Sequence, residues 1–312
     1  MEGKRILTVT LNPAVDKTCR TGELLCGRVN RMRSALNLPG GKGINVSRIL
    51  RQYGYEVAAT GFLGGFPGEW IASCLEKAGI RDEFIRIEED TRSSMNVVAD
   101  NGFVTELLEP GPHISASSLH AFLEHFSGLL PSSSMVALCG SAAPGIPEDI
   151  YARLIREASS QGKRVVLDSS GGLLCQGIAA SPYLIKPNRK ELEYVAGRRL
   201  ESLAEVEEAA RSLQKAGIAK VMVSLGEKGL FLAGEEGSFY AKAPKIKMQN
   251  TVGCGDSVVA SVLMSALSQC GEEEMLRRAA AVSAASAAGF ESGSVPLQLA
   301  EQLYGKIHVE RL

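Results

Sequence analysis

The sequence has no long apolar run, no block of basic residues and no C-x-x-C pair of cysteines. No segment reaches the length of a transmembrane helix, and the first residues lack the apolar stretch of a signal peptide. Its 34 basic and 35 acidic residues leave a net charge of −1, so the chain lacks the positive excess that binds nucleic acids and anionic membranes. We therefore expect neither a nucleic-acid partner nor a membrane partner.

The seven cysteines are scattered along the chain. An odd number of thiols, most of them flanked by apolar residues, is typical of a reduced protein and predicts a cytoplasmic location. The four histidines include no two at metal-ligand spacing, so the sequence does not favour a zinc site.

Short apolar runs rich in β-branched residues alternate with segments of helical periodicity. The predicted strands are 6–11, 57–64, 135–140, 165–168, 183–186 and 220–225. The predicted helices are 43–53, 67–78, 115–129, 148–161, 190–196 and 203–216. Near-continuous apolar strands are typical of a parallel sheet that is buried on both faces. We expect an α/β fold, with a doubly wound and mostly parallel sheet and helices on both faces, as one domain over residues 1–312.

Residues 14–38 and 91–109 interrupt this alternation. The first segment is polar and strand-like, and the second has the pattern of a hairpin that turns at Asn101-Gly102. Together they predict a small β-sheet at the mouth of the site, where it would act as a lid. Because an exposed sheet edge is a liability unless it is paired, we expect a homodimer formed through this lid.

The loop from Asn250 to Asp256 precedes a helix whose apolar residues recur at three- and four-residue spacing. Its glycines, Gly253 and Gly255, allow backbone amides to converge at the helix N-terminus, where the helix dipole favours an anion. Asp256 in the first turn could take a proton from a substrate hydroxyl, and an anion site beside a base is what phosphoryl transfer to an alcohol requires. Local sequence equally allows that Asp256 only caps the helix.

A second glycine cluster, residues 38–46, opens another predicted helix. It is not a Walker A motif, because Gly43 follows Lys42 where serine or threonine belongs. One interpretation is that Gly41 lets a sugar approach the backbone, Asn45 bonds its hydroxyls and Lys42 meets a phosphate. The alternative is an ordinary strand-to-helix turn.

Two further side chains are candidates for binding a sugar phosphate. Asp16 follows the first predicted strand and could accept hydrogen bonds from two sugar hydroxyls, or it could cap a turn. Arg92, just before the hairpin, could clamp a phosphate with its guanidinium, or it could be a solvated surface residue.

The nucleotide side has two candidate segments. Asn188 and Glu191 follow a predicted strand at i and i+3, so they could hold Mg²⁺ through water, or they could form a helix capping box. Residues 224–229 also follow a strand and could line a nucleotide pocket, or they could form a β-turn.

These motifs occur together and in one order: Pro39–Val46, Cys139–Gly145, Asp168–Gly171, Lys186–Glu191, Val223–Gly226 and Thr251–Ser257. The order resembles that of the PfkB (ribokinase-like) sugar kinases, and the resemblance covers essentially the whole chain. Thr10–Asp16 and the Gly-Lys-Gly form of the glycine cluster resemble the phosphosugar branch of the family. Residues 184–193 are most similar to its 1-phosphofructokinases, with tagatose-6-phosphate kinases close to them.

The resemblance implies an ATP- and Mg²⁺-dependent kinase that phosphorylates a ketohexose monophosphate. Conversion of D-fructose 1-phosphate to D-fructose 1,6-bisphosphate is the leading case, with tagatose 6-phosphate or fructose 6-phosphate as the alternative substrate. A sugar-phosphate sensor on a kinase scaffold is a non-enzymatic alternative, and the intact Asp256 and glycine loop argue against it.

The resemblance also implies roles for individual residues. Asp256 would be the catalytic base, and the amides of Gly253, Cys254 and Gly255 would form the anion hole. The sugar phosphate would be bound by Asp16, Gly40, Gly41, Asn45, Lys42, Arg92 and Ser141. Mg-ATP would be bound by Lys186, Asn188, Glu191, Ser224, Gly226, Gly229, Thr251 and Ser283. Cys254 replaces the usual alanine, and we expect oxidation sensitivity if the helix N-terminus lowers its thiol pKa.

Overall fold

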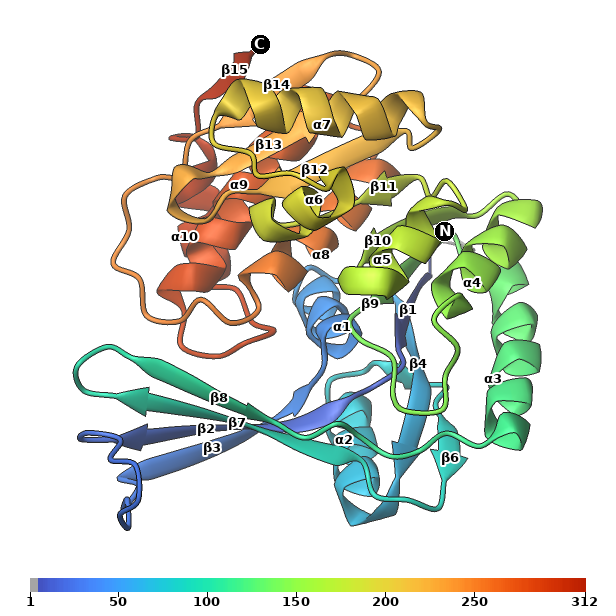
Figure 1. Ribbon diagram of the computed structural model, residues 1–312, viewed down its shortest axis with the longest axis vertical. Coiled ribbons are helices and arrows are strands. Elements are labelled where there is room, and N and C mark those ends of the chain that lie inside the picture. The colour runs from blue at the N-terminus through green and yellow to red at the C-terminus, as the bar shows by residue number, and fades with distance from the viewer. Residues whose placement is uncertain (1–4) are drawn as a thin grey trace.

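The computed structural model describes residues 5–312, in which a large sheet lies between two layers of helices and a smaller sheet projects from it (Figure 1). The large sheet has the strand order β15-β14-β13-β12-β11-β10-β9-β1-β4-β5, and β6 also pairs with β4. Its parallel strands are β1 Ile6–Thr10, β4 Val57–Gly64, β5 Arg81–Asp82, β6 Ile85–Ile87, β9 Met135–Cys139, β10 Arg164–Asp168, β11 Leu184–Ile185 and β12 Lys220–Ser224. This arrangement confirms the predicted doubly wound, mostly parallel sheet.

Three antiparallel strands extend the large sheet beyond β12, and the sequence patterns did not predict them. They are β13 Leu230–Ala233, β14 Ser238–Ala241 and β15 Val309–Arg311. The short strands β13 and β14 are joined by a tight turn, and β15 comes from the far end of the chain. The pattern of alternating strands and helices that predicted the parallel strands is therefore absent here.

Helices cover both faces of the large sheet, as predicted. One face carries α1 Lys42–Gln52, α2 Gly65–Lys77, α8 Cys254–Leu267, α9 Glu272–Ala288 and α10 Leu297–Tyr304. The other face carries α3 Ala116–Leu129, α4 Ile150–Ser160, α5 Gly171–Ile178, α6 Arg189–Ala196 and α7 Leu203–Lys215. Short 3₁₀ turns lie at η1 Leu130–Ser132 and η2 Gly226–Lys228. Because side chains alternate along a strand, Ile6 of β1 packs in the first layer and Leu7 in the second.

Helix α8 is the most deeply buried helix segment next to the site. Val258, Val259, Val262 and Leu263 are buried, and the helix packs between α1 and α9. This packing fixes the N-terminus of α8, and with it Asp256, at the carboxyl edge of the parallel strands, where ligands of such sheets bind.

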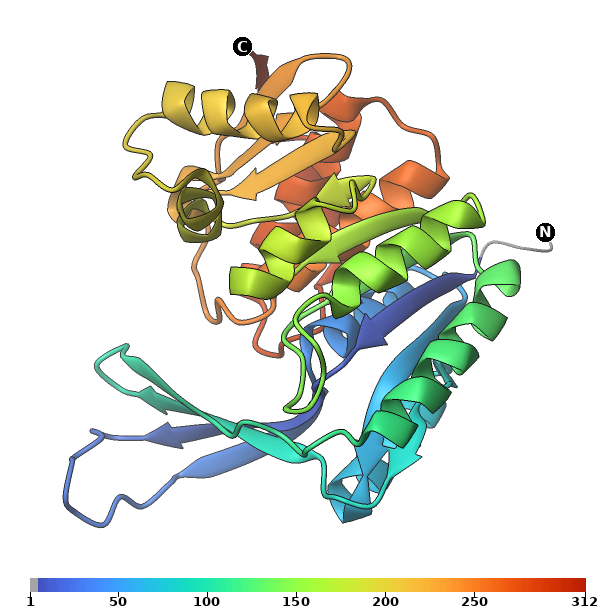
Figure 2. The ribbon, with the colours of Figure 1, turned by 45° about the vertical axis from the view of Figure 1, so that its right-hand side comes forward.

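The smaller sheet has the order β3-β2-β7-β8 and extends away from the body of the molecule (Figure 2). Its strands are β2 Ala14–Thr21, β3 Ser34–Gly40, β7 Arg92–Ala99 and β8 Val104–Leu108. The two hairpins pair antiparallel within themselves, while β2 and β7 pair in parallel. Gly102 takes a positive φ of 87° in the β7–β8 turn, as the predicted Asn-Gly turn requires. We call this sheet the lid.

No helix within residues 5–312 combines the length and the apolar character needed to cross a bilayer.

Candidate active site

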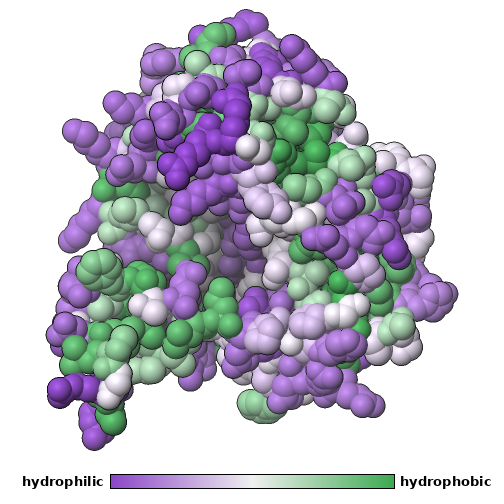
Figure 3. Space-filling model, viewed as in Figure 1, coloured by the Kyte–Doolittle hydropathy of each residue, from purple (hydrophilic) through white to green (hydrophobic). Residues whose placement is uncertain are grey.

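A cavity of about 470 Å³ lies where the lid meets the carboxyl ends of the parallel strands and the N-termini of α1 and α8. Figure 3 shows the surface hollowed between the lid and the body of the molecule. The predicted site residues that line it are Asp16, Gly41, Lys42, Asn45, Arg92, Ser141, Lys186, Asn188, Ser224, Gly253, Gly255 and Asp256. Residues from five of the six ordered motifs, together with Asp16 and Arg92, therefore meet in one place.

Asp256 lies in the first turn of α8, and its carboxylate Oδ2 accepts a hydrogen bond of 2.8 Å from Asn45 Nδ2. The N-cap of the helix is Gly253, in the left-handed region with φ 87°, and no side chain caps it. The alternative that Asp256 only caps the helix is therefore wrong. Burial raises the pKa of Asp256 to about 7, although the charge of Lys42 acts in the opposite direction.

Asp16 lies at the base of the lid, directly against the glycine cluster that precedes α1. A Cβ placed on Gly40 would lie 2.1 Å from Asp16 Cγ, so only glycine allows the two segments to approach this closely. Burial raises the pKa of Asp16 to about 6, and the charge of Arg92 and a hydrogen bond from Ser94 limit the rise. The carboxylate faces the cavity, ready to accept hydrogen bonds from hydroxyl groups.

Arg92 is the first residue of β7, and its guanidinium is held by backbone carbonyls on both sides. It donates to Asn12 O at 3.3 and 3.2 Å and to Glu109 O at 2.9 Å. These bonds fix the guanidinium at the base of the lid, where it also lines the cavity. A fixed planar cation is suited to a phosphate or carboxylate group.

Two lysines converge on Asp168, a residue to which the sequence motifs gave no role. Lys42 Nζ lies 3.0 Å and Lys186 Nζ 3.4 Å from Asp168 Oδ1. Burial disfavours charge on Asp168, but Lys186 and Lys42 hold the pKa of this carboxyl below its usual value. Burial disfavours charge on Lys42, but the charges of Asp168, Asp256 and Glu191 together raise the pKa of this lysine above its usual value. Asp168 ends a buried strand, and this position was the signal that could have marked it.

The nucleotide-side pair forms the capping box that the sequence allowed. Asn188 Oδ1 accepts from Glu191 N at 2.9 Å, and Glu191 Oε2 accepts from Asn188 N at 2.7 Å. Asn188 still lines the cavity and forms a β-bridge with Ser224 at the end of β12.

Residues 224–229 form the turn that was the alternative for this segment, since Lys228 N donates to Leu225 O at 3.3 Å and Gly229 N to Gly226 O at 3.1 Å around η2. Ser224 of this segment lines the cavity. A Cβ on Gly229, which has φ 112°, would lie 2.0 Å from Ala241 O, so this glycine is required for the close approach of β14.

Several predicted residues do not line the cavity within the described chain: Gly40, Glu191, Gly226, Gly229, Thr251, Cys254 and Ser283. Ser283 Oγ instead donates to Cys254 O at 3.4 Å, and Thr251 is exposed. Sequence reasoning missed other lining residues, chiefly Ser94 and Asn96 of β7. Side chains alternate between the two faces of a strand, so Ser94 and Asn96 lie on the same face as Arg92. This alternation could have predicted that they line the cavity.

The condition for oxidation sensitivity of Cys254, a lowered thiol pKa, is not met. Burial, together with the nearby charge of Asp256, raises the pKa of this thiol to about 11, so the reactive thiolate is disfavoured.

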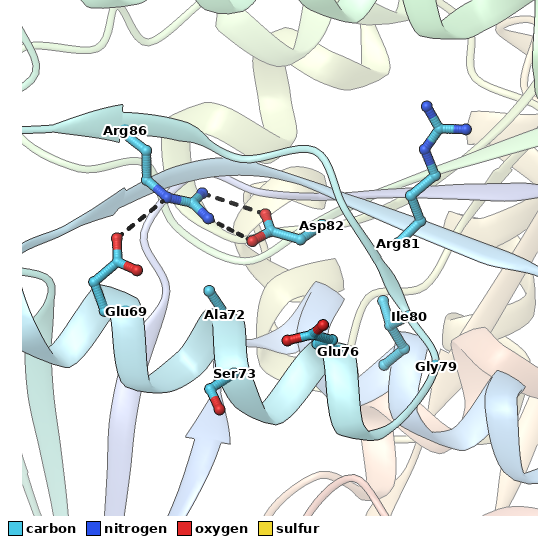
Figure 4. Close-up of a pocket in the computed structure, with 9 residues that line it drawn as sticks. All are labelled: Glu69, Ala72, Ser73, Glu76, Gly79, Ile80, Arg81, Asp82 and Arg86. Atoms are coloured by element: carbon cyan, nitrogen blue, oxygen red, sulfur yellow. Dashed lines mark hydrogen bonds and ion pairs between the residues drawn. The ribbon is translucent and has the colours of Figure 1, made fainter.

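A second cavity, of about 620 Å³, lies between α2 and the β5–β6 edge, away from these motifs (Figure 4). Three of its charged side chains pair with one another, since Arg86 donates to Asp82 and also lies 3.5 Å from Glu69. None of the predicted site residues lines it. We therefore assign the chemistry to the cavity under the lid.

Comparisons with known proteins show which family the chain resembles over almost its whole length. Residues 9–297 match the model of the pfkB family carbohydrate kinases. The 1-phosphofructokinase of Bacillus subtilis is 37% identical over 307 residues, covering 98% of this chain and 100% of that protein. Phosphofructokinase-2 of Escherichia coli in complex with fructose-6-phosphate superposes with a TM-score of 0.89 at 28% identity, covering 97% of this chain and 99% of that one. Its tetrameric inhibited form gives the same TM-score, identity and coverage of both chains, 0.89, 28%, 97% and 99%.

Proposed function

The chain belongs to the pfkB family of carbohydrate kinases, and we propose that it transfers phosphate from ATP to the free primary hydroxyl of D-fructose 1-phosphate. The family acts on alcohol groups of sugars, and phosphofructokinase-type activity follows from the full-length relatives. The observation that carries the proposal is the buried Asp256 carboxylate, bonded to Asn45 of the sugar loop and lying at an amide-rich helix N-terminus. The identity to a 1-phosphofructokinase supports fructose 1-phosphate over tagatose 6-phosphate and fructose 6-phosphate.

In this proposal Asp256 is the general base. Its carboxylate accepts the proton of the attacking hydroxyl while the new bond from that oxygen to the γ-phosphorus forms. The bond from phosphorus to the leaving oxygen of ADP breaks at the same time. Because the pKa of Asp256 is about 7, about half of the molecules carry the base form at neutral pH. Asn45 would hold the carboxylate in position through its 2.8 Å hydrogen bond.

The helix N-terminus supplies the electrostatic part of the reaction. Gly253 and Gly255 line the cavity beside Asp256, and their amides would lie where the helix dipole favours the charge on the transferred group. A Cβ on Gly255 would lie 3.3 Å from Lys186 Nζ, so a cation stands directly beside this loop. Amides and a cation held in place before the reaction stabilise developing charge without reorganisation.

The sugar half of the site is built at the base of the lid. Asp16 and the backbone at Gly41 would bind hydroxyls, and Arg92 with Ser141 would bind the phosphate that the sugar already carries. The lid would exclude water that could otherwise accept the phosphoryl group.

The residues near the nucleotide side fit a metal held through water. Asn188 lines the cavity and Glu191 lies outside its lining, although its charge acts on Lys42. The capping box uses Asn188 Oδ1 and Glu191 Oε2, which leaves Glu191 Oε1 for water around an ion. Asn188 and Glu191 would therefore hold Mg²⁺ indirectly, as this ion prefers. When bound, the ion would neutralise charge on the ATP phosphates.

We also propose that two copies associate through the lid. Val29, Phe103 and Leu107 expose 86%, 73% and 57% of their surface there, which is unusual for apolar side chains without a partner. The solved tetrameric form of the Escherichia coli relative supports assembly. Light scattering at assay concentrations should give the mass of a dimer, and a monomer would contradict this part of the proposal.

The proposed reaction is tested with a coupled assay for ADP release on fructose 1-phosphate, fructose 6-phosphate, tagatose 6-phosphate and fructose. We expect the highest kcat/KM on fructose 1-phosphate, with Asp256→Asn as the inactive control. A preference for another phosphosugar would mean that this sugar is the substrate, while the proposed kinase reaction would stand. Binding of fructose 1-phosphate without turnover of any sugar would indicate a sensor instead.

A further inference from the structure

We propose that Asp168 is a positioning residue that holds Lys42 and Lys186 against the transferred phosphoryl group. The inference rests on the proposed function and deepens it, because it assigns Lys42 to the reacting centre rather than to the phosphate that the sugar already carries. Asp168 itself would not touch either substrate.

Asp168 is unusual because it is a fully buried carboxylate whose contacts are directed into the site. It is 0% exposed at the end of β10, and both lysines contact its Oδ1. Its Oδ2 has no hydrogen-bond partner within residues 5–312. A buried carboxylate with one unsatisfied oxygen is costly, so its presence indicates that the two lysines need it.

The two lysines come from opposite halves of the site. Lys42 is the first residue of α1 in the sugar loop, and Lys186 follows β11 and precedes the nucleotide-side Asn188. Two ammonium groups repel each other, and the shared Asp168 oxygen allows them to remain close together. The cluster retains one net positive charge, which suits a phosphoryl group passing between the two substrates.

The position of the lysine pair also fits the reacting centre. Lys186 Nζ lies 3.3 Å from where a Cβ on Gly255 would be, so the pair faces the anion loop of α8. The charges of Lys42 and Lys186 both act on the carboxyl of Asp256, in the direction that favours its base form. The distal side of the sugar pocket, in contrast, is formed by Asp16 and Arg92 at the base of the lid.

Lys42→Met is the first test, because its side chain is 38% exposed and its loss should not unfold the protein. We expect kcat to fall by about 100-fold while KM for the sugar phosphate changes by less than about threefold. In the absence of sugar, calorimetry should show affinity for AMP-PNP about tenfold weaker and affinity for ADP unchanged, because only AMP-PNP carries the third phosphate. A variant that raised the sugar KM with normal kcat, or that bound AMP-PNP normally, would overturn the proposal.

Asp168→Asn tests the positioning role itself. We expect kcat to fall by about 100-fold, and the acid limb of the pH profile to move to lower pH because the charge of Asp168 raises the pKa of Asp256. Adding Lys42→Met to this variant should cost less than about threefold more, since the lysine is already misplaced. A kcat within threefold of the unsubstituted protein, an unmoved acid limb or fully multiplicative losses would count against Asp168.

The matched control is Glu272→Gln. Glu272 is also a buried carboxylate, 1% exposed, and it pairs with Lys220 at the opposite end of β12 from the site. Its loss should lower the melting temperature without moving the acid limb, which separates positioning from general destabilisation. Failure of the proposed function is seen separately, as absence of turnover by the unsubstituted protein, and the sugar-free AMP-PNP comparison still tests the lysine.

Discussion

Replacing Asp256 by asparagine should remove most of the activity and stabilise the fold at the same time. The asparagine carbonyl can still accept the hydrogen bond from Asn45, so the packing at the start of α8 is kept. Loss of the general base should lower kcat by about 10²–10⁴-fold. The stabilisation follows from the raised pKa of the buried carboxyl.

The size of this stabilisation can be worked from the pKa of Asp256, which burial raises from 3.8 to about 7. The folded state holds the proton of Asp256 more tightly than the unfolded state does. The free-energy cost of burying the charged carboxylate is therefore absent below the unfolded pKa. It grows as the pH rises towards the folded pKa and is constant above it. At about 1.4 kcal/mol per pKa unit, the charged carboxylate destabilises the fold by about 4 kcal/mol above neutral pH. An asparagine side chain carries no charge to be buried, so Asp256→Asn should recover much of this free energy.

Urea unfolding of both proteins at about pH 5.5 and about pH 8 measures the effect. The advantage of Asp256→Asn in the free energy of unfolding should be about 2 kcal/mol larger at the higher pH. Ser261→Ala, in the same helix and also buried, is a control that should show no such pH dependence. A stability difference that stayed constant with pH, or that shrank at high pH, would refute the reasoning.

Three further outcomes follow from the site. Gly40→Ala should raise the KM for the sugar more than about tenfold and leave the KM for ATP unchanged, because the new Cβ would displace Asp16. The control is Gly128→Ala, which has open space around it and should not change the steady-state kinetics. Because the pKa of Asp16 is about 6, KM for the sugar should increase as the pH falls below about 6 while ATP affinity holds, and a flat KM profile would contradict its role. Iodoacetamide at about pH 7.5 should modify the exposed Cys26 before Cys254, as peptide mass mapping would detect, and rapid loss of activity through Cys254 would show that its thiol is not protected.

The sequence predicted the parallel part of the fold because its signals are local. Strands such as 57–64 are buried on both faces and therefore continuously apolar, and the Asn101-Gly102 turn is specified by the two residues themselves. Helices α9 and α10 and strand β15 were not predicted. Helix α9 is rich in alanine and buried around most of its surface, so its pattern lacks the amphipathic period, and β15 is a strand only because β14 lies beside it.

The motifs, read with the family resemblance, included Asp256 and Asn45 among the predicted site residues, and both line the cavity. The motifs did not predict the contacts between residues of different motifs. Lys42 was interpreted as a ligand of the sugar phosphate, and its contact with Asp168 joins residues 126 positions apart, which no local pattern encodes. The thiol of Cys254 shows the same limit, since its burial depends on neighbours contributed by other segments.

The strand pairing of the lid places its proposed ligands at the end of the sheet nearest the body of the molecule. Asp16 pairs with Ser94, and Arg92 pairs with Ala14, on the rungs nearest the body, while the strands continue outward to Thr21 and Ala99. The outer rungs and turns carry none of the proposed ligands. These outer strand ends and turns, which we call the tip, can therefore change in length and composition during evolution without changing the residues that act in the reaction. Such changes would alter which partner the tip binds in an assembly. We expect the tip to diverge fastest among relatives and to accept inserted epitopes or engineered interfaces, while the inner rungs stay fixed.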